Sequence, residues 1–188
     1  NHLHKHVAYQ IKQYDGDIEK ALDNAFVEAD KFLKSSYSFH KGSGSTATVA
    51  IIREEQGQRV VYIANVGDSE AIVNSDGKWH KLTTVHHPDQ KDERQRLKKA
   101  GLEKYIKNDA GCWRLFDCAN SRGFGDFFRK HESSAGLIVK PTIVKRELPD
   151  SGHLLIASDG LWDVAYPEDN GLLVNGLCKQ RCEEHPGL

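Results

Sequence analysis

The sequence has no excess of either charge and no long apolar run, and these absences exclude several classes of protein. Its 188 residues carry a formal net charge of −1, so the charge favours neither nucleic acid nor an anionic membrane surface as a partner. No stretch approaches the roughly eighteen apolar residues that indicate a membrane-spanning helix. The opening residues, NHLHKHVAYQ, lack the apolar core of a signal peptide. We therefore expect no membrane span and no secretion.

Cysteine is scarce, and no C-x-x-C pair occurs. The four cysteines are Cys112, Cys118, Cys178 and Cys182. A chain of this length can build a core without disulfide bonds, so we expect reduced thiols in an intracellular protein of the cytoplasm or nucleus. A zinc site using Cys178, Cys182 and His185 lacks a clear fourth ligand and is not expected.

Two segments have the pattern of helices. In DIEKALDNAFVEADKFL apolar residues recur at helical spacing, and Asp17 stands at the N-cap position. The stretch DERQRLKKAG predicts a second helix that ends at Gly101. No repeat or low-complexity linker divides the chain, so residues 1–188 are expected to form one domain.

β-Branched and aliphatic runs predict the strands. Residues 46–52 and 59–66 flank the polar EEQGQ and indicate an antiparallel pair. Asp-Gly within residues 75–78 predicts a hairpin between two further strands, so that four consecutive strands would form a meander. Two more strands are expected at 137–146 and 153–158. Helices beside mostly antiparallel strands indicate a layered α+β domain.

The last of these strands ends in carboxylates. In ASDGLWDV, Asp159 follows the strand and Asp163 comes four residues later. If the chain turns helically after Gly160, both carboxylates project to the same side, where oxygen ligands suit Mg²⁺ or Mn²⁺. The alternative is a solvated turn in which Asp159 caps the next segment and Trp162 fills the core.

Other polar motifs have simpler interpretations. Asp68, in Gly-Asp-Ser, is expected to bond the amides of a turn. Arg122 precedes Asp126 by four residues; a phosphate contact and an internal ion pair are both open interpretations, the ion pair at least as well supported. The stretch KGSGSTAT precedes a strand, so it does not resemble a P-loop, which opens a helix.

Histidines cluster at two places. His2, His4 and His6 alternate near the N-terminus, and His86 and His87 are adjacent. Alternate histidines on an extended terminus can bind metal adventitiously, but solvated side chains near a frayed end are the favoured interpretation.

Together and in this order, six stretches resemble the metal-dependent protein serine/threonine phosphatases of type 2C, the PPM family. They run from about Gly42 to Val164 and read GSGSTATVAII, VVYIANVGDSEAIV, LTTVHHPDQKDERQRLKKAGL, ANSRGFGD, VKPTIV and HLLIASDGLWDV. The resemblance implies an αββα sandwich of two mostly antiparallel sheets flanked by helices, with a metal cluster at one end.

The resemblance also implies an activity and its cofactors. In that family two Mn²⁺ or Mg²⁺ ions share a water that attacks phosphoserine or phosphothreonine in a phosphoprotein substrate. By motif match, Asp159 resembles a ligand of the catalytic metal pair, and Asp163 resembles a ligand of a nearby third site. Val85 stands where the family has an aspartate at that third site, and it cannot ligate a cation.

Several parts of the family pattern are not found. The Asp-Gly-His-Gly-Gly metal motif has only a superficial echo in YDGD at residues 14–17. Asp169-Asn170 follows Asp163 too closely for the role of the family's late Asp-Asn ligand motif. Glu70 replaces the arginine of the usual Gly-Asp-Ser-Arg. The expectation is thus a single type 2C phosphatase-like domain over residues 1–188 that lacks the N-terminal metal motif and the C-terminal strands.

Two functions follow from this pattern. One is metal-dependent hydrolysis of phosphoserine and phosphothreonine. The alternative is a catalytically inactive pseudophosphatase that serves as a binding or scaffold subunit in a larger complex. Asp159 alone cannot hold two divalent ions, because each takes about six oxygen ligands. An upstream Asp-Gly-His-Gly-Gly would favour the enzyme.

Overall fold

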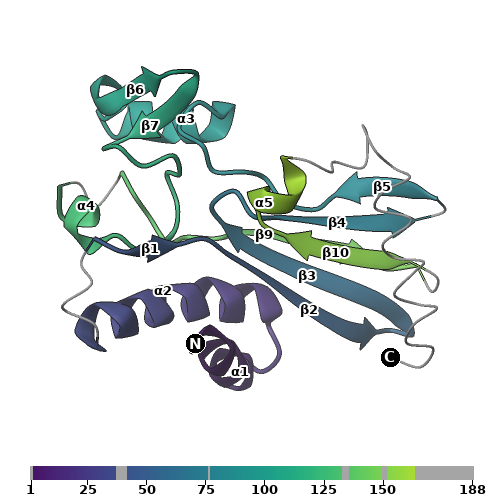
Figure 1. Cartoon of the computed structure of the whole chain (residues 1–188). Helices are drawn as coiled ribbons and strands as arrows, with labels where there is room; N and C mark the ends of the chain where they lie inside the picture. Colours follow the sequence, from purple (N-terminus) through teal and green to yellow (C-terminus); the bar gives the residue numbers. More distant parts are fainter. Residues whose placement is uncertain (1, 37–41, 76, 133–135, 150–151, 164–188) are drawn as a thin grey trace.

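The computed structural model describes residues 2–36, 42–75, 77–132, 136–149 and 152–163. Figure 1 shows two helices below a pair of sheets, with a smaller module beyond one end of the strands. Helix α2 (Ile18–Ser36) confirms the first predicted helix, and Asp17 Oδ1 accepts the Lys20 N–H at 3.2 Å as its cap. None of the described helices is long and apolar enough to cross a membrane.

Helix α1 (Leu3–Gln13) was not predicted, because its histidines suggested a frayed, solvated end. In the helix, His2 and His6 stand one turn apart and both rings pack on Phe32, with centroids 5.0 and 5.6 Å away. Val7 is buried against α2 as well. Tertiary packing thus stabilises a helix that the local sequence pattern does not predict.

The first sheet has the order β2-β3-β9, all antiparallel. Strands β2 (Ala47–Glu55) and β3 (Gln58–Val66) confirm the predicted pair. The strand expected at 137–146 starts late, because β9 is Thr142–Glu147. Ile138 bonds the Ser121–Gly123 segment instead, and Pro141 has no N–H for a ladder.

The second sheet has the order β10-β4-β5. Strands β4 (Glu70–Ser75) and β5 (Lys78–Lys81) form the predicted hairpin, and β10 (His153–Ala157) pairs with β4. The predicted meander is wrong, because β3 and β4 lie in different sheets. The turn at Gly67 (φ +97°) passes the chain from one sheet to the other.

Strand β3 shows how the layers pack. Its side chains alternate between two clusters: Val60, Tyr62, Ala64 and Val66 pack against α1 and α2, whereas Val61 and Ile63 pack against the second sheet. Such alternation is the period of a strand buried on both faces. The α+β sandwich is therefore confirmed, and the described residues contain one of its two expected helical layers.

The smaller module contains α3 (Lys91–Lys99), a 3₁₀ turn η2 (Glu103–Tyr105) and the hairpin of β6 (Ile106–Asp109) and β7 (Cys112–Leu115). Gly101 ends α3 with φ +72°, as predicted. Leu97, Leu102 and Leu115 form its core. Cys112 and Cys118 are free thiols; Cys178, Cys182 and His185 lie outside the described residues.

Three short elements complete the described chain. Strands β1 (Gly44–Ser45) and β8 (Phe124–Gly125) pair near α4 (Phe127–Glu132), and α5 (Asp159–Trp162) follows β10 directly. In Figure 1 α5 stands at the end of the sheets that faces the small module.

Candidate functional site

One end of the sandwich gathers the turns and chain ends that carry polar side chains. Strand β3 ends there at Val66, opposite Ala47, where β2 begins. Strand β10 ends there too, with Ala157 opposite Glu70 of β4. The antiparallel ladders therefore bring the Gly67–Ser69 turn and helix α5 to the same end of the sandwich.

Helix α5 and its C-cap residue carry the two aspartates predicted to bind metal: Asp159 begins the helix and Asp163 follows its last residue. The Asp163 N–H donates to the Asp159 carbonyl at 2.8 Å, so the two residues are one helical turn apart and share a side. Both are exposed, while Trp162 is buried and donates from Nε1 to the Ala157 carbonyl at 2.8 Å. Asp159 Oδ1 also accepts the Gly160 N–H at 2.9 Å. The turn is anchored by the indole and presents its carboxylates outward.

These two carboxylates are fewer ligands than two divalent cations need. Within the described ranges, no group of three His, Cys, Asp or Glu side chains comes together to hold a metal. Val85 is half-buried and has no ligand atom in its side chain. Asp169-Asn170 lies outside the described residues. The described chain thus fits a divalent cation only in part, through hard oxygen ligands on α5.

The Gly67–Ser69 turn is fixed by hydroxyl and amide groups. Thr46 Oγ1 lies 2.8 Å from Ser69 Oγ, and Thr48 Oγ1 donates to the Ser69 carbonyl at 3.2 Å. Asn65 Nδ2 donates to the Gly67 carbonyl at 3.3 Å. The Ser-Thr-Ala-Thr stretch at residues 45–48, which precedes a strand as the sequence indicated, therefore holds this turn through the Thr46 and Thr48 hydroxyls.

Asp68 has a side-chain partner that the sequence interpretation missed. His87 Nε2 lies 3.4 Å from Asp68 Oδ2, and both groups are half-buried. The hydrogen bond with His87 lowers the pKa of the Asp68 carboxyl, and the hydrogen bond with Asp68 raises the pKa of the His87 imidazole. The pair is therefore biased toward the imidazolium–carboxylate form.

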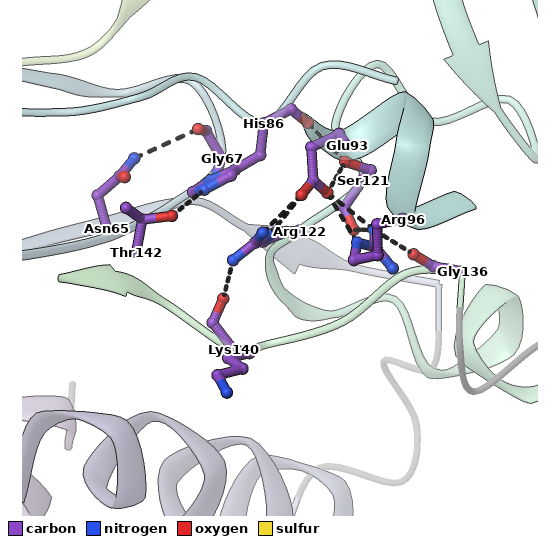
Figure 2. Close-up of polar contacts among 10 residues, drawn as sticks. All are labelled: Asn65, Gly67, His86, Glu93, Arg96, Ser121, Arg122, Gly136, Lys140 and Thr142. Carbon is purple, nitrogen blue, oxygen red and sulfur yellow. Dashed lines mark hydrogen bonds and ion pairs between the residues drawn. The ribbon is translucent and has the colours of Figure 1, made fainter. Parts of the chain in front are cut away.

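His86 joins three segments at this end (Figure 2). Its Nδ1 accepts the Gly67 N–H at 3.0 Å, so Nε2 carries the proton and donates to Thr142 Oγ1 at 2.8 Å. The His86 carbonyl accepts the Ser121 hydroxyl at 2.9 Å. Burial lowers the pKa of His86 to about 4, which keeps the imidazole neutral.

Glu93 connects α3 to the same network (Figure 2). It accepts Arg122 at 3.0 and 2.5 Å, Arg96 Nη2 at 2.8 Å and the Ser121 hydroxyl at 2.6 Å. Burial raises the pKa of Glu93, but the hydrogen bonds from Arg122, Arg96 and Ser121 outweigh it and lower that pKa to about 2. A buried carboxylate with these partners stays ionised.

This geometry decides between the two interpretations of Arg122. The guanidinium N–H groups of Arg122 donate to the Glu93 carboxylate and, at 3.0 Å, to the Lys140 carbonyl. Arg122 therefore forms an internal ion pair with Glu93. The partner is not Asp126, which instead pairs with Arg129 at 3.0 Å. Glu93 was missed because it lies within a charged helix. Its spacing of four from Leu97 was the available signal that it shares the buried face.

A family model described as Protein phosphatase 2C matches residues 1–181. The chain belongs to the protein phosphatase 2C family. Two curated relatives agree: "Probable protein phosphatase 2C 7" of Oryza sativa subsp. japonica is 33% identical over 89% of this chain and 43% of its own length. "Probable protein phosphatase 2C 59" of Arabidopsis thaliana is 38% identical over 84% of this chain and 48% of its own length.

Solved structures share the protein phosphatase 2C fold. A Caenorhabditis elegans sex determining protein superposes with a TM-score of 0.74 at 25% identity, over 88% of this chain and 40% of that one. The serine-threonine phosphatase 2C of Toxoplasma gondii superposes with a TM-score of 0.65 at 20% identity, over 85% of this chain and 56% of that one. At this level of identity the likeness establishes a shared fold and nothing further. The chain spans less than half of the length of the two curated relatives described above.

Proposed function

We propose that the protein is a protein phosphatase that hydrolyses phosphoserine and phosphothreonine with the help of Mn²⁺ or Mg²⁺. The observation that carries the proposal is α5, which presents Asp159 and Asp163 one helical turn apart at the end of β10 in a protein phosphatase 2C chain. Asp159 is proposed as a ligand of the catalytic cations and Asp163 as a ligand of a neighbouring one. The phosphoprotein is the substrate.

The residues of this chain position α5 rather than react. Trp162 anchors the turn to β10, and β10 is held in register by β4. When bound, divalent cations supply a water of lowered pKa and neutralise phosphoryl charge. Because α5 offers only two carboxylates, the remaining ligands have to come from other parts of the full protein. We further propose that residues 1–188 belong to one such domain.

A pseudophosphatase is the second candidate, and a specific observation favours it. Val85 has no ligand atom, and the described residues bring no three ligands together. In that case the fold would act as a binding or scaffold subunit for other proteins. The two candidates differ in whether the folded protein binds divalent cations at α5.

Calorimetric titration of Mn²⁺ into the full-length natural protein separates the candidates. The phosphatase predicts saturable binding that Asp159→Asn abolishes or weakens by at least about tenfold, because a carboxylate ligand becomes a neutral amide. Asp109→Asn, at an exposed position of β6, is the matched control and should bind like the wild type. If well-folded wild-type protein does not bind Mn²⁺, the phosphatase proposal fails and the scaffold function is the candidate that remains.

A further inference from the structure

Two adjacent histidines contact two adjacent residues of the Gly67–Ser69 turn. His86 binds the backbone of Gly67 twice: its Nδ1 accepts the Gly67 N–H at 3.0 Å, and its own backbone N–H donates to the Gly67 carbonyl at 3.1 Å (Figure 2). His87 meets the next residue of the turn, with its Nε2 3.4 Å from Asp68 Oδ2. The segment before α3 therefore holds the turn through consecutive side chains.

The surroundings of His87 favour its charged form. The hydrogen bond with Asp68 raises the pKa of the imidazole, and it outweighs the opposing effect of partial burial. The negative charges of Asp89, in the same segment, and of Glu70, at the start of β4, raise this pKa further. Glu70 is itself paired with Lys81, so Asp68 is the main anion that faces the ring. Because 3.4 Å is long for a neutral hydrogen bond, the attraction depends on the charge of the imidazolium.

The neighbouring ring is in the opposite state. Burial lowers the pKa of His86 to about 4, so this imidazole is neutral and its contact with Gly67 does not change across the neutral and alkaline range. Of the two contacts that these rings make with the turn, only the one between His87 and Asp68 depends on a proton in that range.

The turn leads directly to the residue that anchors α5. Asp68 stands two residues before Glu70, and Glu70 pairs with Ala157 at the end of the β4–β10 ladder. The Ala157 carbonyl accepts the Trp162 Nε1–H at 2.8 Å, and this bond fixes α5. One ladder pair therefore separates the end of the turn from the anchor of the helix that begins with Asp159.

We propose that His87 is a positioning residue of the candidate site. In its imidazolium form it holds Asp68, and through Asp68 it keeps the turn and the end of the β4–β10 ladder in the arrangement that α5 occupies. When the ring loses its proton, this hold weakens and the anchor of α5 moves. His87 acts through Asp68 and does not contact the substrate. This rests on the proposed phosphatase function and adds to it a control of the site geometry by one proton.

The effect of pH has a definite sign. Because the pKa of His87 is raised in the folded protein, the contribution of its contact with Asp68 is complete below the ordinary value of 6.5 and is lost as the pH rises through the raised value. The effect lies on the alkaline side, whereas protonation of His86 acts on the acid side. A lysine in place of His87 keeps its charge throughout, because its ordinary pKa is about 10.4.

Fluorine NMR of the full-length natural protein, labelled with 5-fluorotryptophan, tests the positioning in EDTA and without substrate. The Trp162 resonance is assigned by its absence in Trp162→Phe. Between about pH 6 and about pH 9 it should shift in the wild type and in the control His80→Gln, which changes an exposed histidine of β5. It should stay constant in His87→Lys, where the charge persists. A resonance that shifts equally in the wild type and in His87→Lys would overturn the proposal.

Turnover of p-nitrophenyl phosphate with Mn²⁺ is the second readout. His87→Gln should lower kcat/KM about tenfold near neutral pH, and His87→Lys should restore most of it. As the pH rises, kcat/KM of the wild type should fall relative to that of His87→Lys. Identical pH profiles for the wild type and both variants would refute the positioning role. If no protein turns over the substrate but the Trp162 resonance still responds to pH only where His87 is present, the positioning of α5 stands and the phosphatase proposal falls.

Discussion

The imidazole of His86 accepts the backbone N–H of Gly67 at 3.0 Å, and this contact ties the segment before α3 to the turn between the two sheets. The same ring donates to Thr142 at the start of β9. Because the carbonyl of His86 also receives the Ser121 hydroxyl, one residue joins the turn, the first sheet and the Glu93 network. The end of the sandwich that carries α5 is thereby held by buried polar groups.

Acid should weaken the fold through His86. Burial lowers the pKa of His86 to about 4 from 6.5, so the unfolded chain binds this proton more tightly than the folded protein does. The stability that this residue contributes is complete above pH 6.5 and is lost as the pH falls toward 4, by an estimated 3 kcal/mol. Urea unfolding across this range should show the loss, and His86→Asn should show less of it. Equal pH slopes for wild type and variant would contradict this role.

Loss of the Glu93 carboxylate should destabilise the protein strongly. Glu93→Gln leaves the guanidiniums of Arg122 and Arg96 without their charged acceptor in a buried setting, which costs about 3–5 kcal/mol. Glu28→Gln is the control, because its ion pair with Lys31 is solvent-exposed and worth at most about 1 kcal/mol. Free energies of unfolding from urea titration compare the two, and similar losses would refute the buried role.

Gly67 should tolerate no side chain, and Thr46 is the reason. A Cβ at Gly67 would lie 2.2 Å from Thr46 Cγ2, whereas a Cβ at Gly57 would meet no atom within 4 Å. Both glycines have positive φ. Gly57→Ala therefore measures only the cost of placing a side chain on a left-handed backbone, an estimated 1–2 kcal/mol in the free energy of unfolding. Gly67→Ala should cost about 1–3 kcal/mol more.

Thr46→Ser provides the complementary variant, because it removes the crowding methyl and keeps the hydroxyl near Ser69. In a double-mutant cycle it should recover part of the loss caused by Gly67→Ala. If the effects of the two substitutions on the free energy of unfolding are additive, the loss caused by Gly67→Ala does not come from contact with the Thr46 methyl group.

Local patterns in the sequence predicted most elements, and contacts between distant segments explain what it missed. The spacing in α2, the hairpin of β4 and β5 and the glycine after α3 are local features, and all are confirmed. The sheet change at Gly67 was missed because hairpins and sheet-to-sheet connections both use short turns rich in Gly and Asp.

The site shows the same division between local and distant information. Motif order placed Asp159 and Asp163 together at the end of a strand, and α5 has them one turn apart. The His86–Glu93–Arg122 network was not predicted, because its members come from segments about 30 residues apart and meet only through the fold. No periodic pattern in the sequence marks residues that form charge pairs of this kind.

Phosphate release from p-nitrophenyl phosphate is the most direct test of the central claim, that this protein phosphatase 2C chain delivers Asp159 to catalytic cations. The full-length natural protein is assayed with Mn²⁺ and with EDTA, beside Asp159→Asn and the control Asp109→Asn. We predict Mn²⁺-dependent turnover that Asp109→Asn retains and Asp159→Asn loses by at least about a hundredfold. Turnover that Asp159→Asn leaves intact, or no turnover from folded wild-type protein at any Mn²⁺ concentration, would contradict the claim.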